Sequence, residues 1–224
     1  LGPSGGTIEV DAGTTFVMTS AVDVWGAGTL TKKGAGVLNI NQISSYGGAT
    51  LIEEGDIRLG NSGTLPDAST VEISAEATWN VNGKNDLVKS IRGTGSIRLG
   101  TGSLTVDSDD GTAAFDGVIS AKGTLTKPGA TTVVVTGSNT YSGGTTITEG
   151  KLLANNASGS ATGGGFVNVL NGATLGGNGS VNGMVTVDSG GTLAPGTSPG
   201  KLTVGSQIFK DGSTLALEMG GLEQ

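Results

Sequence analysis

The most constraining feature of this sequence is a stretch that occurs twice. Residues 123–153 repeat residues 28–59, and the two stretches align without a gap over residues 28–55 at an offset of 95 residues. Residues of the first copy that match the second are Gly28, Thr29, Leu30, Thr31, Lys32, Gly34, Ala35, Tyr46, Gly48, Thr50, Ile52, Glu54 and Gly55. Self-similarity at a fixed spacing indicates a repeat architecture, in which each unit contacts only its neighbours.

A nine-residue phrase recurs on a finer scale. Its nine positions are an apolar residue, any residue, an apolar residue, any two residues, glycine, any residue, threonine and an apolar residue. Copies of the phrase start at Ile8, Val71, Val167 and Val185, and a weaker copy starts at Gln207. The alternating half predicts a strand with one buried face, and the glycine predicts a turn. From the spacing between Val167 and Val185, one coil is expected to take roughly 20 residues.

Strands this short do not bury a face alone, but stacked coils bury a continuous column. We therefore predict an all-β fold, a parallel β-helix of about eleven coils in which the offset between the two copies corresponds to about five coils. Residues 1–224 are expected to form a single β-helix segment, with internal repeats near 26–60 and 121–155. Since the sequence begins at Leu1 rather than Met, it is expected to be a fragment of a longer chain.

Two other folds fit the sequence less well than the solenoid. No segment keeps apolar residues at helical spacing over three turns, and the best short helix candidate is residues 84–91, between Gly83 and Gly93. A pair of immunoglobulin-like sandwiches of roughly 100 residues each would suit the long offset. The nested nine-residue phrase favours the solenoid, because it recurs at about the interval of one coil.

Composition excludes several classes of chemistry. The chain has no cysteine and no histidine, so disulfide frameworks, thiolate chemistry and Ser-His-Asp or Cys-His sites are absent. A net charge of −7 with only 12 scattered Lys and Arg residues argues against nucleic-acid binding. No apolar run approaches the ~20 residues of a spanning helix, so we expect no membrane insertion by this segment. No signal-peptide pattern is visible at the start.

The two long copies resemble the passenger-associated transport repeat of bacterial autotransporters. That repeat reads G-x-G-T-L-x-K-x-G-x-G, an apolar strand, and then N-T-Y-x-G-x-T-x-I-x-x-G-x-L. The second copy carries the closing motif as Asn139, Thr140, Tyr141, Gly143, Thr145, Ile147, Gly150 and Leu152. The first copy departs from it, with Ser44 and Ser45 before Tyr46. A further stretch, residues 177–204, is similar to another passenger phrase through Pro195, Gly196, Ser198, Pro199 and Gly200.

This resemblance implies a right-handed parallel β-helix that is exported across the outer membrane and lies outside the cell or on the bacterial surface. Passengers of this kind cross the membrane unfolded and fold outside it. Coil-on-coil contacts are local in sequence, so folding of such a column can propagate from one end.

Two residue pairs recur at equivalent positions and are candidate ligand contacts. Lys32 and Lys127 could form a basic row for anionic glycans, although solvated turn charges that block edges are the more ordinary interpretation. Tyr46 and Tyr141 could stack on sugars, although packing of each ring at a glycine-rich corner is more ordinary.

Other polar and aromatic groups suggest structural roles. Asp107, Asp109 and Asp110 precede Gly111 and are candidate calcium ligands, although the loop lacks regular EF-hand spacing. Side chains expected to form ladders between coils are Asn139, Asn155 and Asn156, and those expected to fill or cap the column are Trp25 and Trp79. We expect no cofactor.

The leading hypothesis is a non-enzymatic stalk of an exported surface protein, which presents other regions or contributes to adhesion. End-to-end or lateral self-association is expected, because a column without caps leaves strand edges open. One alternative is a glycan-binding adhesin module that uses the recurring tyrosines and lysines. Another is a polysaccharide-cleaving enzyme with carboxylates drawn from Glu53, Glu54, Asp109, Asp110 and Asp116.

Overall fold

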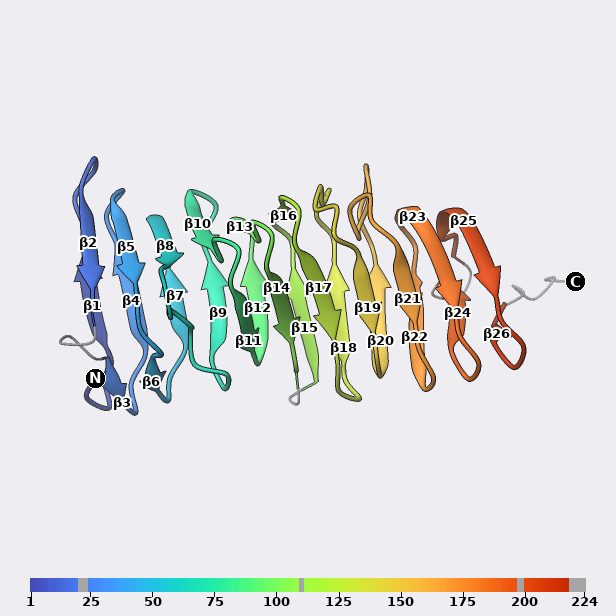
Figure 1. The fold of residues 1–224 in the computed structure, drawn as a ribbon, viewed down its shortest axis with the longest axis horizontal. Coiled ribbons are helices and arrows are strands. Elements are labelled where there is room, and N and C mark those ends of the chain that lie inside the picture. Colours follow the sequence, from blue (N-terminus) through green and yellow to red (C-terminus); the bar gives the residue numbers. More distant parts are fainter. Residues whose placement is uncertain (20–23, 109–110, 197–199, 218–224) are drawn as a thin grey trace, which may run out of the picture.

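The chain winds into a single stack of β-coils. The computed structural model describes residues 1–19, 24–108, 111–196 and 200–217. In Figure 1 the coils follow one another along the long axis, from β1 (Gly6–Glu9) at one end to β26 (Thr214–Leu215) at the other. Every pairing between named strands is parallel. The predicted all-β solenoid is confirmed, and no described residue lies in a helix.

The first sheet runs the whole length of the column. Its described strands, one for each of eleven successive rungs, are β1 (Gly6–Glu9), β4 (Leu30–Lys33), β7 (Thr50–Ile52), β9 (Thr70–Ile73), β12 (Ser90–Gly93), β15 (Thr112–Phe115), β18 (Thr132–Val135), β20 (Gly150–Ala154), β22 (Ala173–Gly177), β24 (Thr192–Pro195) and β26 (Thr214–Leu215).

The other two faces are shared between three shorter sheets. The second sheet covers the N-terminal half with β2 (Thr15–Met18), β5 (Val37–Ile40), β8 (Gly55–Leu59), β10 (Ala77–Asn80), β13 (Ser96–Arg98) and β16 (Val118–Ser120). The third sheet begins in the fourth coil with β11 (Asn85–Val88), β14 (Ser103–Val106), β17 (Thr124–Lys127), β19 (Thr145–Ile147), β21 (Val167–Val169), β23 (Ser180–Val187) and β25 (Thr203–Phe209). A two-stranded sheet pairs β3 (Trp25–Gly26) with β6 (Ser45–Tyr46).

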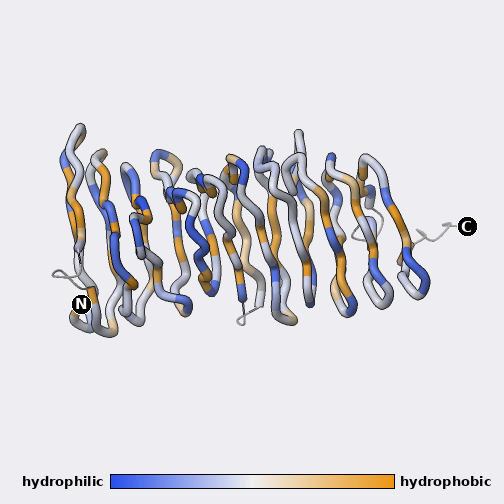
Figure 2. Tube along the Cα trace, in the orientation of Figure 1, coloured by the Kyte–Doolittle hydropathy of each residue, from blue (hydrophilic) through white to orange (hydrophobic). Residues whose placement is uncertain are grey.

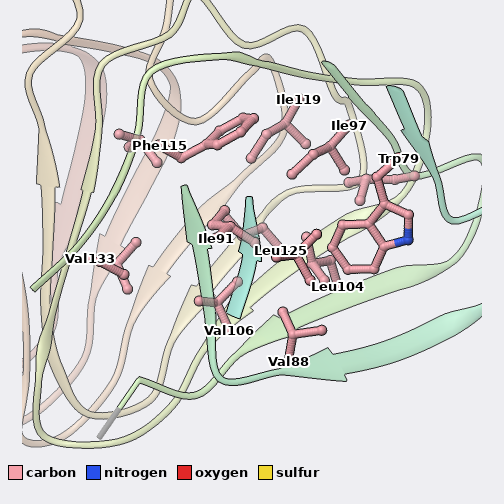
Figure 3. Close-up of a cluster of buried hydrophobic side chains, with 14 of the residues drawn as sticks. Trp79, Val88, Ile91, Ile97, Leu104, Val106, Phe115, Ile119, Leu125 and Val133 are labelled. Carbon is pink, nitrogen blue, oxygen red and sulfur yellow. The ribbon is translucent and has the colours of Figure 1, made fainter. Parts of the chain in front are cut away.

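Identical or similar apolar side chains stack from coil to coil. On the second sheet the register places Leu38 beside Ile57, Ile57 beside Trp79, and Trp79 beside Ile97. All four side chains are fully buried. Figure 3 shows part of this column, and Figure 2 shows apolar bands recurring along successive rungs. Burying each such side chain contributes about 1.5–3 kcal/mol, so the apolar column is the main stabilising element.

Coil length varies, and this corrects the prediction about the long offset. Gly6 pairs with Leu30, whereas Thr174 pairs with Thr192, so the coil that starts at Gly6 is clearly longer than the coil that starts at Thr174. The strand β17 of the second copy lies four coils and two faces beyond β4 of the first, not five whole coils. The best helix candidate, residues 84–91, instead forms β11 and the start of β12.

Candidate functional site

The recurring lysine of the first copy lies inside the column. Strand β4 alternates, so Lys32 points to the same side as the fully buried Leu30, and Lys32 itself is 0% exposed. Its Nζ donates hydrogen bonds to the carbonyl oxygens of Lys33 at 2.9 Å, Gly34 at 2.6 Å and Glu54 at 3.1 Å. The first acceptor is the last residue of β4, the second lies in the turn that follows, and the third belongs to the next coil, so the ammonium ties two coils together.

The second copy repeats this arrangement on another face. Lys127 lies at the end of β17, is 0% exposed, and donates to the carbonyl oxygens of Pro128 at 2.8 Å, Gly129 at 2.5 Å and Glu149 at 3.2 Å. We call each of these arrangements a lysine node: one ammonium group with its three carbonyl acceptors. The two nodes use residues at equivalent positions throughout.

The chemistry of the nodes is structural. Burial lowers the pKa of Lys32, and the carboxylates of Asp56 and Glu54 oppose this. Burial likewise lowers the pKa of Lys127, against the opposing carboxylates of Asp107 and Glu149. Because an ammonium has three donors, three carbonyl acceptors satisfy it completely. The interpretation of these lysines as solvated turn charges is therefore wrong, and neither side chain reaches the surface where a glycan row would have to lie.

The recurring tyrosines are also interior. Tyr46 is 2% exposed and Tyr141 is 0% exposed. The Tyr46 hydroxyl shares a 2.6 Å hydrogen bond with the Thr50 hydroxyl, and Tyr141 does the same with Thr145 at 2.6 Å. Burial raises the pKa of both phenols. Both rings are therefore packed inside the column, and no ring face is open for a sugar to stack on.

In the first copy the corner continues into the next coil. The Thr50 hydroxyl also lies 2.9 Å from the Ser69 hydroxyl, which donates to the Gly48 carbonyl at 3.2 Å. The second copy has Gly165 in the position of Ser69, two residues before the strand residue that pairs with the threonine. Its Tyr–Thr pair therefore lacks this extension.

Asparagine side chains link neighbouring coils, but they do so through backbone groups and not as the predicted ladders of amides. The Asn139 side chain accepts from the Ile119 N–H at 2.7 Å and donates to the Ala161 carbonyl at 2.6 Å, joining three coils. Asn156 accepts from the Ser180 N–H at 2.8 Å, and Asn155 accepts from the Asn178 N–H at 2.9 Å. The second sheet ends at β16, and beyond it these side-chain amides take the place of backbone hydrogen bonds between neighbouring strands.

The predicted calcium ligands are only partly described. Asp107 is exposed, and Asp109 and Asp110 lie outside the described residues. No cluster of three or more carboxylates that could hold a metal ion occurs within residues 1–19, 24–108, 111–196 and 200–217. Of the two tryptophans expected to fill or cap the column, Trp79 fills it at 0% exposure, whereas Trp25 is 68% exposed and does not fill it.

Two of the carboxylates proposed for polysaccharide cleavage, Glu53 and Asp116, lie far apart. Glu53 forms an ion pair with Lys33 at 3.2 Å, and Asp116 accepts from the Thr136 hydroxyl at 2.5 Å. These two carboxylates lie three coils apart, or about 14 Å along the axis at ~4.8 Å per rung. A glycosidase pair lies about 5–9.5 Å apart.

One buried acid was missed by the sequence analysis. Asp86, in β11, is 4% exposed, and its Oδ2 accepts a hydrogen bond from the Leu65 N–H at 3.1 Å. Burial raises its pKa to about 7. The alternation of β11 would have revealed it, because Asp86 lies two residues before the buried Val88.

Comparison with known proteins agrees with this architecture. Residues 30–59 and 125–154 match the passenger-associated-transport-repeat family, and these are the two copies that carry the lysine nodes. A similar protein is the adhesin BmaC autotransporter of Brucella suis biovar 1 (strain 1330), which is 37% identical over 105 residues. The chain therefore carries two passenger-associated transport repeats and is similar in sequence to an autotransporter adhesin. The match covers 47% of this chain and 3% of the Brucella protein. No solved structure matches it.

Both matched stretches include a lysine node and a Tyr–Thr pair. Within the described residues, the chain has no helix long and apolar enough to cross a bilayer.

Proposed function

We propose that this chain is a non-enzymatic structural column, which presents other regions of a surface protein or contributes to adhesion through its length and stiffness. The observation that supports this is the placement of the recurring polar residues. Lys32, Lys127, Tyr46 and Tyr141 are at most 2% exposed, and all four hold coils or corners in place. Groups that could otherwise meet a ligand are used within the stack.

The mechanical basis of this proposal is the way each coil is fixed to the next. Parallel backbone pairing runs through eleven rungs of the first sheet, and the lysine nodes add charged ties at two corners. Hydrogen bonds to a charged group contribute about 1.5–3 kcal/mol each, more than neutral ones. A column tied in this way resists separation of its coils.

The experiment that tests the proposal uses the purified chain. Small-angle scattering is expected to give a rod of constant cross-section, and incubation with acidic polysaccharides is expected to release no new reducing ends. A compact scattering profile would contradict the column. Release of reducing ends that is lost in Glu53→Gln or Asp116→Asn variants would instead favour the enzymatic alternative.

We also propose that the segment is exported and exposed outside the cell, in keeping with its similarity to an autotransporter adhesin. Antibodies raised against the purified chain are expected to label intact producing cells without permeabilisation. Labelling only after permeabilisation would contradict export.

Association between copies is a further part of the proposal. At one end β1 and β2 each have a single strand partner, and at the other end β25 and β26 do. Apolar side chains lie exposed at both ends, among them Phe16 at 45% and Leu215 at 48%. Unpaired edges of this kind template pairing with another chain. Sedimentation of the isolated chain is expected to show concentration-dependent association, and a monomer over a wide concentration range would contradict it.

A further inference from the structure

The third sheet begins in the interior of the column, and the way it begins is unusual. Its first strand, β11, pairs with β14 on one side only. On the other side lies the segment of residues 60–69, which contains no strand and makes one isolated bridge, between Ile43 and Thr64. The edge of β11 is therefore covered by irregular chain, and its backbone lacks a regular ladder partner there.

Asp86 connects the two sides of this junction. Its Oδ2 accepts the Leu65 N–H at 3.1 Å, so a side chain takes the place of a backbone ladder bond between the third and fourth coils. The Leu87 N–H also donates to the carboxyl group. The other oxygen, Oδ1, is buried and has no hydrogen-bond partner.

The surroundings of this carboxyl group are apolar or acidic. Its register partner on β14 is Leu104, which is fully buried, as is Leu65 on the covering segment. The ionisable groups that face it are Asp67, on the same covering segment, and Tyr46, on β6.

The charged groups nearest in sequence do not offset a charge on Asp86. Lys84 and Lys89 flank β11 and Asp107 follows β14, but none of them is among the groups that shift the pKa of Asp86. The groups that do shift it are the two donating N–H groups and the carboxylate of Asp67. Ionisation of Asp86 therefore places a negative charge in an apolar and acidic environment.

We propose that Asp86 is a protonation site that couples the stacking of the third coil on the fourth to pH. Oδ2 accepts the Leu65 N–H in both protonation states, but ionisation places a charge among buried apolar side chains and near Asp67. Opening of the 60–69 segment lets water reach that charge. Ionisation of Asp86 therefore favours separation of this segment from β11.

The direction of the effect follows from the shift in pKa. Burial raises the pKa of Asp86 from 3.8 to about 7, opposed by the hydrogen bonds from Leu65 and Leu87 and assisted by Asp67. A group whose pKa is higher in the folded state stabilises that state fully below its unfolded pKa, and this stabilisation is lost as pH rises to the folded pKa. The junction is thus tightest in acid and loosens between about pH 4 and pH 7.

The test is the hydrogen exchange of the Leu65 amide in the whole chain, expressed as a protection factor at each pH. In the unmodified chain this factor is expected to fall by up to about tenfold per pH unit between pH 5 and pH 7, relative to Asp86→Asn. Asp86→Asn should show no such fall, because its side chain does not ionise. The Thr145 amide, which donates to Phe166 far along the column, serves as an internal control and should not change.

Two further variants make the test decisive. Glu76→Gln removes an exposed carboxylate and should behave like the unmodified chain. Asp67→Asn leaves Asp86 in place but removes the neighbouring negative charge, so the end of the fall should move to lower pH. Parallel profiles in the unmodified chain and Asp86→Asn would overturn the proposal. If Asp86→Asn does not fold, the proposal would be overturned by an Asp67→Asn variant whose Leu65 protection depends on pH as it does in the unmodified chain.

Discussion

The two passenger repeats have the same corners on different faces of the column. In the first copy the node strand β4 belongs to the long first sheet, whereas in the second copy the equivalent strand β17 belongs to the third sheet. The lysine contact to the next coil is nevertheless 3.1 Å in one copy and 3.2 Å in the other, and both Tyr–Thr contacts are 2.6 Å. The comparison shows that the repeat encodes a local corner structure, and that this structure does not depend on the face that carries it.

What differs between the copies is what lies against them in neighbouring coils. A Cβ on Gly34 would come within 2.4 Å of the Val10 carbonyl oxygen, but one on Gly129 would meet the Asp107 side chain at 2.6 Å. The first copy has the additional Ser69 hydroxyl and the Lys33–Glu53 ion pair, whereas the second has Pro128 in the position of Lys33. Shared contacts should therefore respond equally to mutation, and unshared ones should not.

The largest expected effect is the loss of a node. Lys32→Met and Lys127→Met should each destabilise the column by about 3 kcal/mol, because the buried carbonyl oxygens lose their donor. The two variants should agree, since the nodes are equivalent. Urea unfolding followed by circular dichroism measures this, and Lys33→Met is the matched control with an exposed side chain. A control that is as damaging as either node variant would contradict the argument.

The second-largest expected effect is the cost of replacing a turn glycine by alanine, which should differ between the two copies. Gly34 and Gly129 have φ of +73° and +76°, so alanine at either position costs about 1–2 kcal/mol from backbone strain. Gly34→Ala should cost about 1 kcal/mol more than Gly129→Ala, because a backbone carbonyl yields less easily than a side chain. Thermal unfolding of the two variants makes the comparison. Gly55→Ala and Gly150→Ala both meet backbone and should be equally destabilised; a large difference between them would refute this account.

A smaller difference is expected at the tyrosine corners. Tyr141→Phe leaves the buried Thr145 hydroxyl without its side-chain partner and should cost about 1–2 kcal/mol. Tyr46→Phe should cost less, about 1 kcal/mol, because Thr50 keeps its hydrogen bond to Ser69. Adding Ser69→Ala to Tyr46→Phe should remove this difference in cost between the two corners, because Thr50 then loses its hydrogen bond to Ser69. Equilibrium unfolding of these variants forms the test, and a larger cost for Tyr46→Phe alone would contradict it.

The smallest effect concerns the surface pair found only in the first copy. Lys33 and Glu53 are 47% and 44% exposed, and exposed ion pairs contribute about 0–1 kcal/mol. Lys33→Ala should therefore change the unfolding free energy by about 0.5 kcal/mol or less, and less still at high salt. A larger change that persists in salt would indicate that Lys33 also supports the node beside it.

Much of the corner structure was open to prediction from the sequence. The alternation Leu30-Thr31-Lys32 places lysine on the same side as leucine, and the same holds for Leu125 and Lys127. The general rarity of buried lysine led to the surface interpretation, and it was the tertiary structure that supplied the compensating carbonyl oxygens. One of the three acceptors comes from the next coil, and the sequence does not show which carbonyl will lie there.

The sequence by itself determined that the chain repeats, that its strands are short and half-buried, and that stacked coils are the way to bury them. Only the tertiary structure decided which face each copy occupies, because coils of unequal length do not convert the offset between the copies into a whole number of turns. It also decided the environment of Asp86. A side chain that alternation places inward gains its hydrogen-bond donor, or lacks one, only when a distant segment of the chain folds against it.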